Sequence, residues 1–264
     1  MNYKRRLLSQ NFLRNQELVA RLVGMANFGP NDTVIDIGAG RGVITRELAK
    51  VAKEVVAVEI DPRLEEELRR QFSDNPKVKV VLSDIRRFTL PNYPYKVFAN
   101  IPFHLTADIV YKLLYYSKPP TEAYLIMAKE AAQKFSGFPR ETQFSLLAQP
   151  WFDFKILVNI DRSEFTPDPS VDIVLLRISV RQKPLIEPEE EILYKSFIKF
   201  AFSTWKKDLK KGLSKILTYS QWKKLAKDNK FNFHSRPTDL NLFQYLSLFR
   251  FISTKAYLKK DKFI

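Results

Sequence analysis

Residues 33–59 read TVIDIGAGRGVITRELAKVAKEVVAVE and combine two β-branched runs with one glycine-rich turn. The first run, residues 33–37, is followed by Gly38, Gly40 and Gly42, three of the seven glycines in the chain. Apolar residues at helical spacing then lead into the second run. A glycine-rich turn between a strand and a helix lets a ligand approach the backbone and the helix N-terminus. We therefore predict a strand, a ligand-binding turn, a helix and a second strand; a turn with a purely structural role is the alternative.

The same alternation of short apolar runs with helical stretches continues along the chain. Strands alternating with helices favour a parallel, doubly wound α/β sheet of the Rossmann-like kind. The pattern predicts helices over 43–53, 62–72 and 106–116, strands over 33–37, 55–59, 78–82, 96–99 and 123–127, and two further strands near 154–160 and 173–180.

The composition excludes several classes of protein. Of 264 residues 45% are hydrophobic, which is enough for a folded core. No cysteine is present, which excludes disulfides, thiolate nucleophiles and cysteine-bound metals, and two histidines are too few for us to expect any metal site. No apolar run reaches the ~18–20 residues that span a bilayer. The basic start, MNYKRR, lacks the apolar stretch of a signal peptide. We expect a soluble, cytoplasmic protein.

The net charge of +15 predicts a polyanionic partner, either nucleic acid or an anionic membrane surface. Residues 185–264 hold 17 Lys and Arg against 8 Asp and Glu. The proline-containing segment 183–188 precedes them, and helical spacing follows it. We therefore expect an α/β domain over 1–183 and a small, basic, all-helical domain over 184–264. A membrane surface is less favoured, because no isolated amphipathic anchor is apparent.

Two carboxylates follow the second and third predicted strands. Glu59 ends one of them, where it can accept hydrogen bonds from ribose hydroxyls, and Asp84 ends the next, where it can hold an adenine amino group. Both would lie at the carboxyl edge of the sheet, where α/β folds bind ligands. Val43 stands where a dinucleotide fingerprint needs a small residue, and the chain has no G-K-S/T sequence, so a P-loop is excluded.

The fourth strand is followed by Asn100-Ile101-Pro102-Phe103. This tetrad resembles the catalytic motif of S-adenosylmethionine-dependent amino-methyltransferases; a proline turn with one inward aromatic is the alternative. The resemblance implies that the Asn100 oxygen and the Ile101 carbonyl accept hydrogen bonds from an exocyclic amine. Pro102 would restrain these acceptors, and Phe103 would stack on the base. No strong general base is required, and we assign the neighbouring His104 a packing role.

Two further segments resemble rRNA adenine dimethyltransferases. Residues 9–13, SQNFL, resemble the segment that closes over S-adenosylmethionine, and residues 165–171, FTPDPSV, resemble an element in which Phe165 helps form the target-base pocket. Together the motifs cover most of residues 9–178. The resemblance implies that S-adenosylmethionine is the cofactor, with contacts from Asn11, Leu13, Gly38, Gly40, Glu59, Ile60, Asp84, Ile85 and Asn100.

The family has two main branches. The KsgA-like branch dimethylates adjacent adenines of small-subunit rRNA. The Erm branch methylates one adenine N6 in the peptidyl-transferase region of 23S rRNA and confers macrolide, lincosamide and streptogramin B resistance. Ser9, the Ile and Phe of the tetrad, the basic composition and residues 239–251 favour the Erm branch. Whether one or two methyl groups are transferred stays open. A non-catalytic nucleic-acid-binding factor on the same fold is a further alternative, against which the intact tetrad argues.

A target adenine within folded RNA must be extruded, at a cost of a few kcal/mol, to reach a pocket at the sheet edge. Phosphate contacts on either side would offset that cost, although a run of lysines can also be merely a solvated face. We expect the protein to act as a monomer. The candidate RNA contacts are Lys4, Arg5 and Arg6 near the N-terminus and Lys206, Lys207, Lys210 and Lys211 in a second predicted helix, whose apolar residues are Leu209, Leu213, Ile216 and Leu217.

Overall fold

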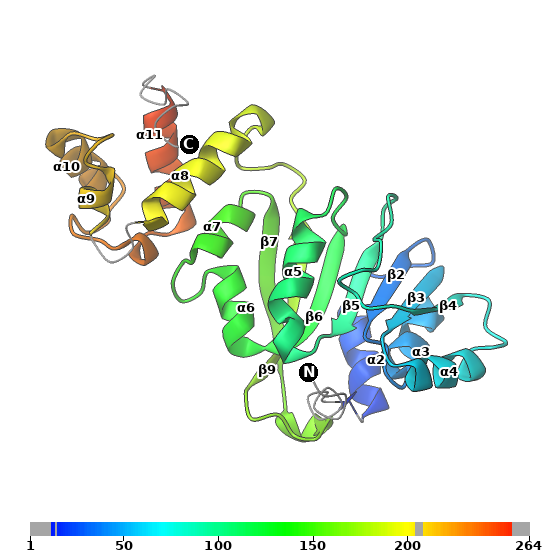
Figure 1. Ribbon diagram of the computed structural model, residues 1–264. Coiled ribbons are helices and arrows are strands. Elements are labelled where there is room, and N and C mark those ends of the chain that lie inside the picture. The colour runs from blue at the N-terminus through cyan, green and yellow to red at the C-terminus, as the bar shows by residue number, and fades with distance from the viewer. Residues whose placement is uncertain (1–11, 14, 204–207, 255–264) are drawn as a thin grey trace. The chain divides into compact units, whose positions relative to one another are not determined.

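The computed structural model describes residues 12–13, 15–203 and 208–254 (Figure 1). The chain forms two compact units. The first unit contains the described residues up to 132 together with 153–180, and the second contains 133–152 and the described residues from 181 onward. Each unit is described by itself below.

A seven-stranded sheet forms the centre of the first unit (Figure 1). Its first five strands are parallel, the sixth is antiparallel to the fifth, and β7 forms the final edge. This architecture confirms the predicted α/β class and the doubly wound sheet. In spatial order the strands are β4 (Val78–Leu82), β3 (Glu54–Glu59), β2 (Thr33–Ile37), β5 (Lys96–Asn100), β6 (Glu122–Ala128), β9 (Ile173–Val180) and β7 (Phe152–Ile160).

The predicted elements of this unit have nearly the bounds expected from the sequence, because the inner strands are buried on both faces. Val34 and Ile35 of β2 are completely buried, as continuous apolar runs in a parallel sheet should be. Leu22 and Leu48, from α2 and α3, pack in one cluster with Val34. The helices of the unit are α2 (Gln16–Gly24), α3 (Val43–Val51), α4 (Pro62–Gln71), α5 (Thr106–Tyr115) and α6 (Lys129–Ser136), whose last residues belong to the second unit.

A second, two-stranded sheet was not predicted from the sequence. β1 (Phe12–Leu13) pairs antiparallel with β8 (Phe165–Thr166), and Leu13 lies opposite Phe165 in the register. This pairing joins the two segments that resembled family motifs, 9–13 and 165–171. Strands of two residues have no periodicity from which they could be recognised.

The second unit is all-helical, as expected. Tyr194, Phe197 and Phe249 are buried in its core together with Leu146, which comes from the segment 133–152. The Tyr194 hydroxyl also donates a 2.9 Å hydrogen bond to the Leu146 carbonyl. We had not expected residues 133–152 in this unit. Its helices are α7 (Gln143–Ala148), α8 (Glu191–Ser203), α9 (Leu209–Leu213), α10 (Tyr219–Asp228) and α11 (Leu242–Thr254).

The lysine-rich helix is shorter than predicted. Asp208 caps α9 by accepting a hydrogen bond from the Lys211 N–H, and the helix ends at Leu213 rather than continuing through Leu217. The Leu217 N–H still bonds to the Leu213 carbonyl at 2.9 Å, but the chain turns there and Thr218 caps the next helix. Across the described ranges, no helix is long and apolar enough to cross a membrane.

Candidate functional site

The glycine turn between β2 and α3 borders two hollows at the carboxyl edge of the sheet. The first, here called the Glu59 hollow, is lined by Gly38, Glu59, Ile60, Ser83, Asp84, Ile85 and Pro102, among others. The second, the Asn100 hollow, is lined by Phe12, Leu13, Gly38, Gly40, Arg41 and Asn100, among others. Gly38 belongs to both, so they adjoin. The structure thus brings together eight predicted cofactor contacts, all except Asn11, which lies outside the described residues.

The glycines leave room that side chains would fill. Gly38 has a φ of +72°, and nothing lies within 4 Å of the position a Cβ would take, so an added side chain would enter open space beside the hollows. Gly40 has a φ of +57° and lies against the Phe12 ring. Positive φ values disfavour any residue but glycine. The cradle fits an extended ligand that approaches the backbone closely, as S-adenosylmethionine would have to.

The Glu59 carboxylate is buried and already organises the turn. Its Oε2 accepts the Gly40 N–H at 2.8 Å, and its Oε1 accepts the N–H groups of Ile60 and Asp61 at 2.8 and 2.9 Å. A carboxylate offers about four acceptor positions, so these three bonds leave one on Oε2. Glu59 therefore holds the glycine turn in shape and can still accept one hydrogen bond from a ligand hydroxyl in the Glu59 hollow.

Asp84 has a partner that the sequence analysis did not consider. Both of its carboxylate oxygens accept hydrogen bonds from the Arg86 guanidinium, Oδ1 at 3.1 Å and Oδ2 at 2.5 Å. The interaction with Asp84 raises the pKa of Arg86. A ligand amino group that bound Asp84 would share the carboxylate with this guanidinium. The spacing Asp-x-Arg was visible in the sequence and is the signal that could have found the pair.

The tetrad joins the end of β5 to a short 3-10 helix, η1 (Phe103–Leu105). Asn100 is half-buried and lies opposite Ile126 of β6 in the register. The Ile101 N–H donates to the Ile126 carbonyl at 3.1 Å, which fixes the direction of the chain as it leaves the sheet. The Pro102 carbonyl accepts the Leu105 N–H at 2.9 Å. Backbone bonds on both sides of the tetrad therefore hold Asn100 at the rim of its hollow.

Of three side chains to which the sequence analysis assigned roles, Phe103 is placed as expected, whereas Phe165 and His104 are not. Phe103 is half-buried against the core, so part of its ring remains accessible for stacking. Phe165 is only 1% exposed and packs in the same core cluster, so in this conformation its ring does not reach the surface. His104 is exposed, so the packing role assigned to it is wrong. His104 follows a proline turn, where the sequence has no periodic pattern that would show whether its side chain is buried or exposed.

A buried acid lies directly before the glycine turn, and sequence reasoning missed it. Asp36 of β2 is completely buried, and its Oδ2 accepts a 2.6 Å hydrogen bond from the Thr45 hydroxyl of α3. Its Oδ1 has no hydrogen-bond partner among the residues described. Burial raises the pKa of Asp36 to about 7, and the nearby Glu59 carboxylate adds to the rise. A lone carboxylate inside the apolar run TVIDI is the sequence signal for such a residue.

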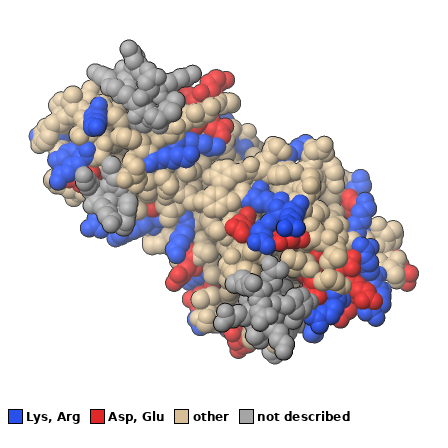
Figure 2. All heavy atoms as spheres, in the orientation of Figure 1, with Lys and Arg blue, Asp and Glu red and all other residues tan. Residues whose placement is uncertain are grey.

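The second unit carries many of the basic side chains (Figure 2). Lys211 of α9 is exposed, whereas Lys210 is half-buried. The Lys210 ammonium lies 4.4 Å from the centre of the Phe233 ring and 5.9 Å from that of Tyr219. Exposed lysines that the sequence analysis had not singled out lie nearby in the chain, at 215, 223, 224 and 227. Lys4, Arg5, Arg6, Lys206 and Lys207 lie outside the described residues.

The described residues contain no group of three or more His, Cys, Asp or Glu side chains that could hold a metal ion. The two hollows are bordered by backbone N–H groups, carboxylates and residues of the tetrad. Their arrangement can hold a nucleoside by its ribose and can present an amide oxygen to a second ligand at the Asn100 rim.

The sequence matches the ribosomal RNA adenine dimethylase family over residues 1–254. It is 31% identical over 246 residues to an rRNA adenine N-6-methyltransferase of Bacteroides fragilis, covering 92% of each chain. It is 36% identical over 185 residues to an rRNA methyltransferase of Streptomyces thermotolerans, covering 70% of this chain and 62% of that protein. It is 32% identical over 217 residues to a ribosomal RNA small subunit methyltransferase A of Streptococcus thermophilus, covering 78% and 75%. The solved 23S rRNA methyltransferase ErmE matches with a TM-score of 0.86 and 28% identity, covering 92% of this chain and all of that one.

Proposed function

Because the chain belongs to the ribosomal RNA adenine dimethylase family and is an S-adenosylmethionine-dependent rRNA adenine-N6 methyltransferase, we propose that it methylates one adenine in the peptidyl-transferase region of 23S rRNA. Methylation there would confer macrolide, lincosamide and streptogramin B resistance. The observation that carries the proposal is the similarity to the ErmE 23S rRNA methyltransferase, which extends over the whole of that chain. The matched part, 92% of this chain, includes both its α/β part and its helical part.

The residues of the Asn100 rim would act on the target amine. When bound, S-adenosylmethionine supplies an electrophilic methyl group. The Asn100 amide oxygen and the Ile101 carbonyl would accept hydrogen bonds from N6–H, which directs the nitrogen lone pair toward the incoming carbon. The tetrad acceptors would hold the amine during methyl transfer, and the N6 proton that is then lost would pass to water. Orientation supplies much of the rate in such a transfer, so the fixed backbone around the tetrad matters.

The half-buried ring of Phe103 would stack on the flipped adenine. Phe165 is buried opposite Leu13, so it would support the base pocket from within the core. Glu59 and Asp84 would hold the nucleoside part of the cofactor. Leu13, Gly38, Gly40, Ile60 and Ile85 would complete its contacts, with Asn11 from the undescribed N-terminal segment.

The basic residues 184–264, most of the helical second unit, would hold the rRNA backbone. Its exposed lysines support this role, because each phosphate contact releases a counterion and makes binding steeply dependent on salt. The residues proposed for this grip are Lys211, the exposed lysines of α10, and Lys206, Lys207, Lys4, Arg5 and Arg6 beyond the described part. Lys210 is a weaker candidate, since two aromatic rings cover its ammonium.

A small-subunit rRNA target is the second candidate, favoured by the 32% identity to the Streptococcus thermophilus small-subunit enzyme. The deciding experiment offers labelled S-adenosylmethionine with protein-free 23S rRNA, protein-free 16S rRNA and small ribosomal subunits. Primer extension then locates the modified base. A stop at a single peptidyl-transferase adenine is expected. Transfer confined to 16S rRNA or to small subunits would refute the 23S assignment and leave the family chemistry standing.

A further inference from the structure

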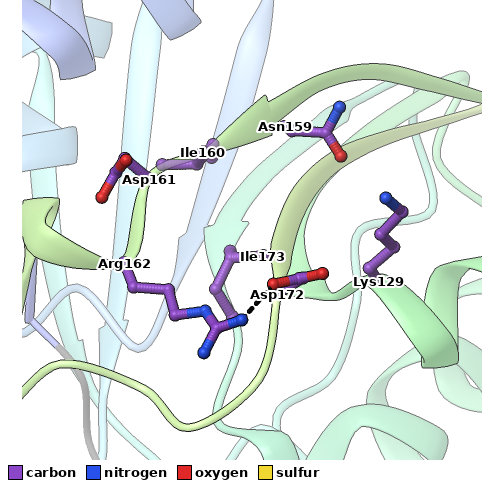
Figure 3. A pocket seen from close by; sticks show the side chains of 7 residues that line it. All are labelled: Lys129, Asn159, Ile160, Asp161, Arg162, Asp172 and Ile173. Carbon is purple, nitrogen blue, oxygen red and sulfur yellow. Dashed lines mark hydrogen bonds and ion pairs between the residues drawn. The ribbon is translucent and has the colours of Figure 1, made fainter.

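A cavity outside the two hollows lies at the same carboxyl edge of the sheet (Figure 3). Its volume is about 540 Å³, within the range of small-molecule sites. The buried side chains of Ile160 and Ile173 form its apolar lining. Its polar lining comes from Lys129, Asn159, Asp161, Arg162 and Asp172.

Four elements position these side chains. Lys129 begins α6 directly after β6, and its N–H bonds to the Asp172 carbonyl at 2.8 Å. Asn159 lies near the end of β7, and Arg162 opens the short 3-10 helix η2 (Arg162–Glu164). The Arg162 guanidinium donates a 2.5 Å bond to Oδ1 of Asp172. Figure 3 shows the Lys129 ammonium and the Asn159 amide directed toward one space, with the Asp172 carboxylate beside it.

Part of this polar lining is unengaged within the described chain. The side chains of Lys129 and Asn159 form no hydrogen bond with another described residue, and Oδ2 of Asp172 likewise accepts none. A cation, an amide and a carboxylate oxygen together can bind a phosphate and the mixed donor and acceptor edge of a base. The two isoleucines are buried beneath these polar groups and form the floor of the cavity.

The cavity adjoins the reacting site along the sheet. Asn100 lies opposite Ile126 of β6, and Lys129 follows Ile126 by three residues. On the other side, η2 leads directly into Phe165, whose strand partner Leu13 lines the Asn100 hollow. Neighbouring strands are separated by roughly 5 Å. The strand order places Lys129 one spacing, Ile173 two and Asn159 three from the strand of Asn100. The cavity therefore lies roughly 5–15 Å along the sheet from Asn100, a span that the next nucleotide of the same RNA strand can reach when it is drawn out of the stack.

We propose that this cavity binds the nucleotide adjacent to the target adenosine, with its phosphate on Lys129 and its base edge on Asn159 and Asp172. The proposal rests on the function proposed above and extends it. The flipped adenine would then be held from both sides: by the tetrad, and by a neighbour drawn out of the RNA stack. Recognition of that neighbour would add sequence selectivity that the tetrad alone does not supply.

The test uses hairpin RNAs that carry the peptidyl-transferase target adenine, one unmodified and two with an abasic site directly 5′ or 3′ of it. The wild-type protein should lose about tenfold in kcat/KM, mainly through KM, on one abasic RNA. Asn159→Ala should show a similar loss on the unmodified RNA and no further loss on that abasic RNA. Lys129→Ala should lose activity on all three RNAs and show a shallower dependence on salt. Lys155→Ala removes an exposed lysine four residues from Asn159 on β7 and serves as the matched control.

S-adenosylmethionine affinity and the melting temperature should not change in any variant, which separates RNA recognition from misfolding. Two results would overturn the proposal: a wild-type protein indifferent to both abasic sites, or an Asn159→Ala deficit that persists on the abasic RNA. If the wild type methylates a small-subunit hairpin instead, the 23S assignment fails and the same abasic series on that hairpin tests the cavity. Methylation of neither RNA would overturn both proposals.

Discussion

Replacing Asp36 with asparagine should change how the stability of the first unit depends on pH. Burial raises the pKa of Asp36 from its ordinary 3.8 to about 7. Between these values the folded protein keeps the carboxyl proton and the unfolded chain has released it. The folded state therefore binds more protons, and the free energy of unfolding falls as pH rises through this window.

The expected magnitude follows from the width of the window. Each pH unit well below the folded pKa removes roughly 1.4 kcal/mol, and the slope halves at the pKa itself. The wild type should therefore lose about 2.3 kcal/mol between pH 5 and pH 7 from this group alone, and about 0.4 kcal/mol more by pH 8. The asparagine side chain of the variant cannot titrate, while its amide oxygen can still accept the Thr45 hydroxyl. The variant should therefore gain about 2–3 kcal/mol relative to the wild type between pH 5 and pH 8.

Urea unfolding followed by circular dichroism at pH 5, 6, 7 and 8 measures this difference. Asp168→Asn, which neutralises an exposed acid in the same unit, is the control and should give curves parallel to those of the wild type. Thr45→Val removes a hydrogen bond that favours the ionised carboxylate, so the loss of stability should extend to higher pH. If the Asp36→Asn and wild-type stabilities stay parallel across the range, Asp36 is ionised throughout and the reasoning fails.

Three further predictions concern the tetrad, the glycine turn and the basic surface. Asn100→Ala should keep S-adenosylmethionine binding by calorimetry and lose methyl transfer by label incorporation; undiminished transfer would remove the residue from the mechanism. Gly42→Ala should destabilise the protein by about 1–3 kcal/mol in thermal melts, because φ is +74° and a Cβ would meet α4 side chains at 2.8 Å, whereas Gly24→Ala meets nothing within 4 Å and should be neutral or stabilising. Lys211→Ala should lower the salt slope of RNA binding by about 1 in filter-binding titrations. Lys210→Ala should leave that slope unchanged and lower stability by about 1 kcal/mol; equal salt slopes for both variants would contradict this distinction.

The sheet was predictable because its signals are local and repeated. Apolar runs such as 33–37 and 55–59 have no other stable place than the interior of a parallel sheet, and glycines directly after one of them fix the ligand edge. Glu59 and Asp84 could be located because strand ends of one parallel sheet meet at one edge. The same reasoning predicted that Asn100, at the end of the next strand in the chain, lies at that edge.

The features that were missed depend on contacts between distant segments. The burial of Phe165 follows from its pairing with Leu13, more than 150 residues earlier, and no local pattern contains that pairing. The partner of Asp84 is the exception, because Arg86 is only two residues away and the Asp-x-Arg spacing could have indicated the pair. Lys210 looks like its neighbour Lys211 in the sequence, and only the aromatic rings from residues 219 and 233 distinguish the two.

The segment 133–152 has a consequence for synthesis of the chain. Leu146 belongs to a core that is completed by residues as late as Phe249, about a hundred residues further on. At a translation rate of about 5–20 residues per second, its apolar side chain waits on the order of 5–20 s for its partners. The α/β sheet, in contrast, already has all its strands by Val180. On the ribosome the sheet can therefore form before the helical core is complete, and the apolar side chains of residues 133–152 stay uncovered and open to chaperones and proteases during that interval.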